Sequence, residues 1–351
     1  MAKSGLEFKS IQPVLCDGGE WSLCIGAGTS QPLLPDWYTL VERMINHYCD
    51  SKDRISIDVY KKLGFSADAM IQAVRNHIGG TDEEFTKKLS EEVYFPIKSR
   101  VNNKEWKAFS KIHESVGYLG ITKNDWILFE DVKSRLLDNT SANLLAEPII
   151  QAVYKDQGPK SILTFNGEAI FLALLKYYYY SMSGKKGSLK SKFDRIVNGI
   201  NRLHSSSIPY VHCHGMLPID GIKPKVGYKA DTKLIFTEER YLKIANSPMS
   251  WQALQFIENC MNSKMVFVGV SLTDANMRRW LGWIHKNKMD EFAENSFDCK
   301  DSTEHFWIRK KPGTDLEKIW IEESVSHLGV RLIWIDDYNQ TGEVLKKMLA
   351  L

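Results

Sequence analysis

Residues 21–37 read Trp-Ser-Leu-Cys-Ile-Gly-Ala-Gly-Thr-Ser-Gln-Pro-Leu-Leu-Pro-Asp-Trp. An apolar run at residues 23–25 leads into Gly26 and Gly28, a pattern that predicts a buried strand turning sharply towards a helix start. Glycine permits positive φ and lets backbone N–H groups approach a ligand, and such groups at a helix N-terminus bind anions. The stretch predicts either a pyrophosphate site or a tight turn, since Gln31 stands where a dinucleotide fingerprint has its third glycine.

The composition is that of an ordered globular protein. Of its residues, 43% are hydrophobic and 25% are charged. The length of 351 residues suits two domains or one Rossmann-type domain with a large insertion. The net charge of +3 is too small to indicate a nucleic-acid partner. The six cysteines form no Cys-x-x-Cys pair, and the sequence shows neither a signal peptide nor an apolar run of membrane-spanning length. We therefore expect a cytoplasmic protein that does not bind membranes.

The chain is expected to be a single domain, residues 1–351, with a helical insertion at about residues 38–157. Apolar residues recur in the insertion at helical spacing, and no convincing strand interrupts them. The Rossmann-like core then comprises about residues 16–37 and 158–351.

Strands return after the insertion and alternate with helices. We expect strands at residues 161–165, 208–212, 265–270, 305–309 and 330–335, and the apolar run 265–270 suits a central strand covered on both faces. This alternation predicts an α/β fold, a Rossmann-like doubly wound parallel sheet with right-handed crossovers.

A basic segment, residues 181–195, is rich in Gly and Ser. Its positive charges are Lys185, Lys186, Lys190, Lys192 and Arg195. The composition predicts a mobile, solvated loop, with a phosphate or partner contact as the alternative.

Polar residues follow four of the expected strands. They are Gly26-Ala27-Gly28-Thr29-Ser30, Thr164-Phe165-Asn166-Gly167-Glu168, His214-Gly215 and Gly269-Val270-Ser271-Leu272-Thr273-Asp274. Because ligands of such sheets bind at the carboxyl ends of the strands, we expect these motifs to form one site.

In this order the motifs resemble the NAD-binding and catalytic motifs of the sirtuin superfamily, and the resemblance extends over nearly the whole chain. It is closest to the bacterial sirtuin-like domains of anti-phage defence, in which sequences similar to Pro35-Asp36-Trp37 recur and the activity is NAD hydrolysis. Protein deacylases of the superfamily carry a zinc ribbon of two Cys-x-x-Cys pairs, which this sequence lacks, so we expect neither zinc nor deacylation. Glu168 also replaces the aspartate of the deacylase pattern Thr-x-Asn-x-Asp.

The resemblance implies a role for each motif. Asn166 and His214 are the implied catalytic pair, because water or a ribose hydroxyl must be positioned and deprotonated while the bond to nicotinamide breaks. The implied NAD contacts are Gly26, Ala27, Gly28, Thr29 and Ser30 at the diphosphate and nearby ribose, Ser271 and Asp274 near the adenosine half, and Asp36, Thr164 and Gly269. For Asp36, a helix start beside a packed Trp37 is the favoured alternative.

Two functions from other classes stay open beside NAD hydrolysis to ADP-ribose or a cyclic relative. One is a non-catalytic module that senses NAD or an ADP-ribose-type nucleotide and signals to a partner. The other is a metal-dependent hydrolase centred on His212 and His214, which strand alternation places on one face. Because constant NAD hydrolysis would kill the host, we expect a homo-oligomer that stays inactive until a partner changes its assembly. A ring-shaped ATPase translocase or an Argonaute-like protein, as in related systems, would fit that partner.

Overall fold

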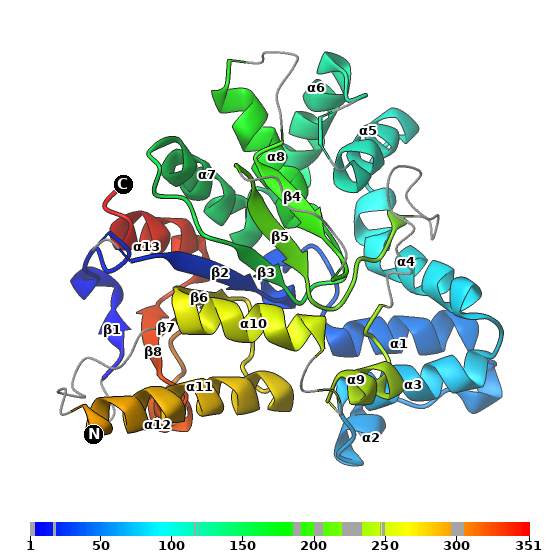
Figure 1. Ribbon diagram of the computed structural model, residues 1–351. Helices are drawn as coiled ribbons and strands as arrows, with labels where there is room; N and C mark the ends of the chain where they lie inside the picture. The colour runs from blue at the N-terminus through cyan, green and yellow to red at the C-terminus, as the bar shows by residue number, and fades with distance from the viewer. Residues whose placement is uncertain are drawn as a thin grey trace.

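The computed structural model describes residues 4–16, 19–115, 117–118, 120–184, 191–199, 206–219, 234–245, 247, 250–295 and 305–351. Its strands form one parallel sheet of eight, in the order β1-β8-β7-β6-β2-β3-β5-β4 (Figure 1). The strands are β1 (Leu6–Glu7), β2 (Trp21–Ile25), β3 (Ile162–Thr164), β4 (Phe193–Ile196), β5 (Ile208–His212), β6 (Lys264–Val268), β7 (His305–Lys310) and β8 (Val330–Ile335).

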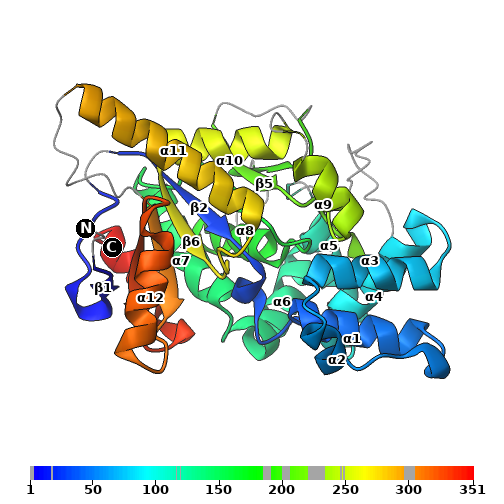
Figure 2. The ribbon, with the colours of Figure 1, turned by 90° about the horizontal axis from the view of Figure 1, so that it is seen from below.

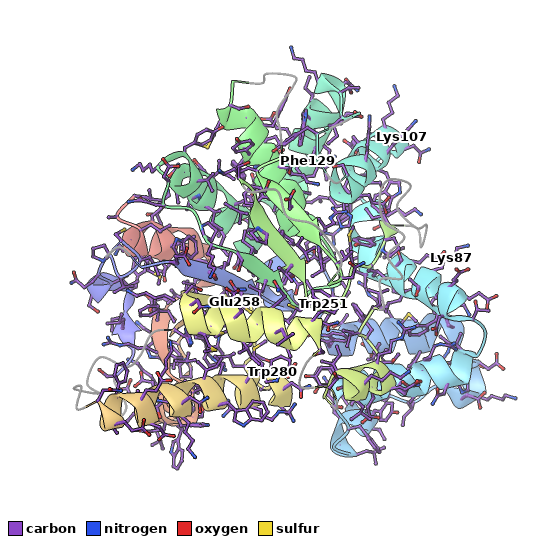
Figure 3. The ribbon with its side chains drawn as sticks, viewed as in Figure 1. Lys87, Lys107, Phe129, Trp251, Glu258 and Trp280 are labelled. Carbon is purple, nitrogen blue, oxygen red and sulfur yellow. The ribbon has the colours of Figure 1, made fainter. Side chains whose placement is uncertain are left out.

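Helices cover both faces of this sheet (Figure 2). Leu23 and Ile25 of β2 belong to the core on the face covered by α7 and α8, and Cys24 between them belongs to the core under α10 and α11. On that second face Trp280 of α11, which Figure 3 labels, packs against Phe256 of α10, and the two ring centroids are 5.6 Å apart. The doubly wound α/β fold predicted from the sequence is therefore confirmed.

The α-helices of the described residues number thirteen. They are α1 (Trp37–Tyr48), α2 (Ile57–Lys62), α3 (Ala67–Ile78), α4 (Asp82–Lys98), α5 (Asn103–Glu114), α6 (Lys123–Val132), α7 (Ser141–Tyr154), α8 (Ile170–Met182), α9 (Glu238–Ala245), α10 (Trp251–Asn262), α11 (Ala275–Glu294), α12 (Asp315–Ser326) and α13 (Thr341–Met348). None of the described helices is both long and apolar enough to cross a bilayer.

The chain between β2 and β3 forms helices α1–α7 in its described part. The first of these begins where the sequence predicts, because Asp36 caps α1 by accepting a hydrogen bond of 2.7 Å from the Thr39 N–H. Helices α1, α3 and α4 lie at the side of the sheet where β2 ends (Figure 1), so this helical block borders the carboxyl edge.

The expectation of a loop throughout residues 181–195 is wrong. Residues 181–182 end α8, and Phe193–Ile196 form the edge strand β4. Arg195 is buried because its guanidinium donates to the carbonyl oxygens of His113 and Glu114, at the carboxyl end of α5, where helix carbonyls need partners. Lys185, Lys186 and Lys190 lie outside the described residues.

The order of the strands locates the ligand edge. From β2 the sheet extends through β3, β5 and β4 on one side and through β6, β7 and β8 on the other. The chain completes the first side, with the edge strand β4 before β5, and then crosses to β6 on the second side. The strand order reverses at β2, and ligands of open α/β sheets bind at such a switch point. The turns that follow β2 and β6 meet there.

Candidate functional site

The turns after β2 and β6 are in backbone contact. The Gly28 N–H donates to the Gly269 carbonyl oxygen at 3.0 Å, and the Gly26 N–H donates to the Val268 oxygen at the same distance. A Cβ on Gly26 would lie 2.6 Å from the Gly269 oxygen, and Gly269 itself has φ of 66°. The sequence left both a pyrophosphate site and a tight turn open for Gly26 and Gly28, and in the structure the Gly28 amide is already bonded within the protein. The close approach of the two turns is the first reason for glycine here.

Glu168 joins the turn after β2 to the start of α8. Its buried carboxylate accepts hydrogen bonds from the Ser30 hydroxyl at 2.6 Å, from the Asn166 side-chain amide at 3.0 Å and from the Ile170 N–H at 2.5 Å. Burial raises the pKa of Glu168, and these three donors act in the opposite direction. The sequence assigned Glu168 no role, although its position two residues after Asn166 was a usable signal.

Asn166 is fixed on one side and open on the other. Its side-chain amide also donates to Thr29 Oγ1 at 3.4 Å, and its backbone N–H donates to Thr164 Oγ1 at 3.1 Å. Its Oδ1 is buried and has no hydrogen-bonding partner among the residues that the structure describes. A buried acceptor without a partner lowers the free energy of unfolding unless a ligand or a water molecule donates a hydrogen bond to it. Thr29 and Thr164 thus lie behind Asn166, and neither is among the residues that line the two cavities described below.

His214 lies just beyond the end of β5 and is partly buried. Its ring meets those of Phe165 and Tyr241 edge-on, at centroid distances of 4.9 and 6.0 Å. Burial lowers the pKa of His214, and the Asp274 carboxylate acts in the opposite direction. Asp274 caps α11, since its Oδ1 accepts hydrogen bonds from the Asn276 and Met277 N–H groups at 2.7 and 3.0 Å. A lowered pKa leaves the imidazole neutral near pH 7, so it can accept a proton.

His212 does not share this site. It is fully buried, its ring centroid is 5.1 Å from that of Tyr210, and it lines neither cavity. The strand ends at His212 and the chain turns through Gly215, with φ of 76°, so strand alternation does not extend to His214. The expected common face was wrong for that reason. The described residues contain no group of three or more His, Cys, Asp or Glu that could hold a metal ion, so the geometry gives no support to the metal-dependent alternative.

Two adjoining cavities open at the carboxyl edge of the sheet. The smaller, of about 340 Å³, holds both implied catalytic residues, and the larger, of about 650 Å³, lies over the ends of β7 and β8. Both are lined by Gly28, Gln31, Gly269, Val270 and Ser271. The predicted site residues that line the smaller cavity are Gly26, Ala27, Gly28, Ser30, Asp36, Asn166, His214, Gly269, Ser271 and Asp274.

The larger cavity contains residues that the sequence analysis missed. Trp307 donates from its indole nitrogen to the Val270 oxygen at 3.0 Å, and the Arg309 guanidinium lies 4.6 Å from the Trp307 ring centroid. Tyr338 and its neighbours after β8 complete the wall. The signal was present, because both strands were predicted and the rule for carboxyl ends applies to them equally.

The fold and the site together define an α/β protein with a divided crevice at its switch point, suited to an elongated polar ligand. Residues 173–328 match the family model of the SIR2-like domain, which supports a relation to the sirtuin-like superfamily. The match includes His214 and the turn after β6, whereas Gly28 and Asn166 lie before it. A SIR2-like domain fits a function that involves NAD. No curated protein matches the chain.

Proposed function

We propose that this protein is an NAD hydrolase that releases nicotinamide and either ADP-ribose or a cyclic relative. The observation that carries the proposal is that Asn166 and His214 line one cavity. The Asn166 amide oxygen has no partner among the described residues, and the pKa of His214 is below its ordinary value. The two residues come from the ends of β3 and β5, which are neighbours in the sheet.

The two cavities match the two halves of a dinucleotide. In this proposal the nicotinamide ribose occupies the smaller cavity beside His214, and the adenosine half occupies the larger cavity beside Trp307 and Tyr338. The diphosphate then crosses the shared wall at Gly28 and Gly269. Because Asp274 lines only the smaller cavity, we place it with the nicotinamide half instead of the adenosine half.

The chemistry assigns one task to each catalytic residue. Cleavage of the bond between nicotinamide and ribose leaves positive charge on the ribose, and the oxygen of water forms the new bond to that carbon. Asn166 Oδ1 accepts a hydrogen bond from the water or from a ribose hydroxyl and so orients it. His214 takes the proton that the water loses, which balances the reaction.

Substitution of the catalytic pair tests this proposal. Asn166→Ala and His214→Ala should each lower nicotinamide release, followed by chromatography, by about two to four orders of magnitude, the range usual for general acid–base groups. His327→Ala is the matched control, because His327 is exposed at the end of α12 and lines neither cavity. Wild-type turnover in His214→Ala would exclude His214 as the base. NAD binding by the wild type without nicotinamide release would favour the sensor alternative.

We extend the proposal to an effector of bacterial anti-phage defence that acts by NAD depletion. Its support is the resemblance of the motifs, together with the need to silence an NAD hydrolase in an uninfected cell. In this proposal the chain self-associates and stays inactive until a partner, such as a ring-shaped ATPase translocase or an Argonaute-like protein, changes its assembly. Size-exclusion chromatography with activity measured across the fractions tests this, and full activity in an isolated monomer would contradict it.

A further inference from the structure

Residues 234–245, here called the strap, lie against the smaller cavity and end in α9. The Ile235 N–H donates to the His214 carbonyl oxygen at 2.9 Å. Phe236 lines the cavity and packs against Trp37, with ring centroids 5.0 Å apart. It also fills the space beside Gly167, where a Cβ would collide with its ring. The start of the strap is therefore tied to the backbone of the proposed catalytic base.

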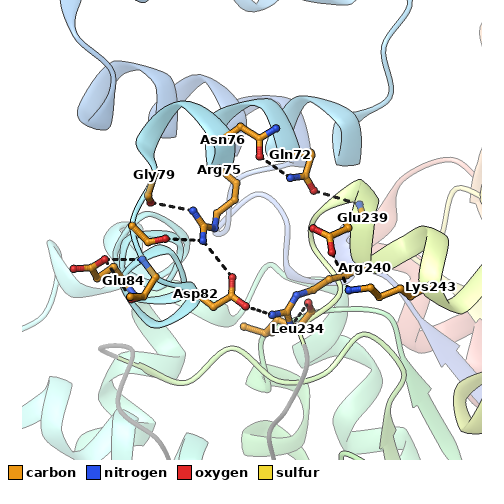
Figure 4. Close-up of polar contacts among 12 residues, drawn as sticks. Gln72, Arg75, Asn76, Gly79, Asp82, Glu84, Leu234, Glu239, Arg240 and Lys243 are labelled. Carbon is orange, nitrogen blue, oxygen red and sulfur yellow. Dashed lines mark hydrogen bonds and ion pairs between the residues drawn. The ribbon is translucent and has the colours of Figure 1, made fainter.

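The helical part of the strap is held from the other side by α3 and α4 (Figure 4). The Glu239 N–H donates to Gln72 Oε1 at 3.2 Å, and Arg240 pairs with Asp82, which also contacts Arg75 at 3.4 Å. The Asp82 side chain is 66% exposed, and exposed ion pairs contribute little to stability. The apolar contact of Phe236 is thus the main anchor, and the polar contacts join α9 to α3 and α4.

Tyr241 of α9 packs against the proposed catalytic base. Its ring lies edge-on to the His214 imidazole, at 6.0 Å between centroids and an interplanar angle of 78°. Burial raises the pKa of Tyr241, and the nearby Asp274 carboxylate at the start of α11 acts in the same direction. Asp274 is already fixed there by two backbone N–H groups, so it cannot easily follow a change in Tyr241.

We infer that Tyr241 of α9 is a positioning residue for His214, because its ring packs edge-on against the imidazole. Tyr241 lines neither cavity, so it acts on His214 and not on the substrate. The inference rests on the proposed function only where it treats His214 as the base.

The groups that face His214 determine whether substitution of Tyr241 raises or lowers the pKa of this histidine. They are Asp274 from α11, Asp68 from α3, Tyr241 from α9 and the backbone of Phe165 after β3. Removing the Tyr241 ring admits water, which relieves the burial that lowers the pKa of His214. Removing the hydroxyl also takes away a polar group near Asp274, so the negative charge of that carboxylate acts more strongly on His214. Both changes raise the pKa of His214, whereas Asp274→Asn lowers it.

The test measures the protonation of His214 in the full chain without NAD, from the NMR signal of its Cε1–H group, assigned with His214→Gln. In Tyr241→Ala the midpoint should lie above the wild-type value by about 0.5–1 pH unit, a modest shift on the scale of protein pKa changes. Tyr241→Phe, which keeps the ring, should shift it less and in the same direction. Lys243→Ala is the control, since its side chain is 72% exposed on the same helix. Unchanged midpoints in folded Tyr241→Ala and Tyr241→Phe would overturn the inference.

Kinetics separate this inference from the proposed function. If the protein hydrolyses NAD, Tyr241→Ala should lower kcat about tenfold with little change in KM, because an interaction that acts only on the reacting groups affects kcat. A loss that appears only in KM would make Tyr241 a substrate contact and contradict its positioning role. A wild type without hydrolase activity would defeat the proposed function, and the NMR midpoints would still decide the role of Tyr241.

Discussion

The Ser30 hydroxyl donates a hydrogen bond of 2.6 Å to the Glu168 carboxylate, and this bond joins the turn after β2 to the start of α8. The same carboxylate holds the amide of Asn166. One buried acid thus connects the glycine turn, the proposed catalytic amide and a helix start, so it should support both folding and turnover.

Glu168→Ala should destabilise the protein and impair catalysis together. The substitution leaves three donors without their acceptor, those of Ser30, Asn166 and Ile170, and each buried unsatisfied group costs about 1–3 kcal/mol. We expect a clear fall in the free energy of unfolding in urea, with nicotinamide release lowered under conditions where the variant is folded. Glu343→Ala, at an exposed pair on α13, is the control. Equal stability of the two variants would show that the Glu168 contacts contribute nothing.

Gly269→Ala should lower the free energy of unfolding by more than the left-handed backbone conformation of this residue alone explains. Gly269 and Gly64 both have positive φ, but a Cβ at Gly269 would collide with the Thr29 backbone, whereas a Cβ at Gly64 meets nothing within 4 Å. Gly64→Ala therefore measures the cost of the left-handed conformation, about 1–2 kcal/mol. We expect a larger loss of unfolding free energy in Gly269→Ala, together with weaker NAD binding by calorimetry. Equal losses in the two variants would mean that the two turns can separate freely.

The fall of kcat/KM at low pH should reflect the protonation of His214. A base must be deprotonated to act, and burial lowers the pKa of His214, so activity should persist below the ordinary histidine value of about 6.5 and then fall as the ring gains its proton. Asp274→Asn removes the carboxylate that opposes this shift, so kcat/KM of that variant should fall at a still lower pH than in the wild type. A midpoint of this fall above the ordinary histidine pKa, or a higher midpoint in Asp274→Asn than in the wild type, would contradict the assignment of His214 as the base.

Tyr338→Ala should affect substrate binding more than chemistry. Tyr338 lines only the larger cavity, where we place the adenosine half, so its loss removes binding shared by the ground state and the transition state. We expect KM for NAD to rise about tenfold, a cost of about 1.4 kcal/mol, while kcat is retained. Trp320→Ala is the aromatic control, because Trp320 is 70% exposed on α12 and lines neither cavity. An unchanged KM would mean that the adenosine half of NAD does not bind in the larger cavity.

Sequence alone determined the fold class and the edge of the sheet at which the two cavities open. Periodicity and composition are local properties, so the runs now seen as β2, β5 and β6 could be recognised one at a time, and parallel strands bring their carboxyl ends together. The same local reasoning failed for β4, whose sequence carries Arg195, because the partner that makes its burial favourable is the end of α5, far away in the chain.

Only the tertiary structure decided which polar groups are already occupied. The sequence could name Gly28, Asn166 and His214, but the Gly28 amide bonds to Gly269, the Asn166 amide bonds to Glu168, and the Asn166 oxygen is left open. It could not find Tyr241, because a tyrosine on an amphipathic helix gives no sign of what it will face. Hydrogen-bond partners and burial depend on residues far apart in sequence, so they appear only when the chain is folded.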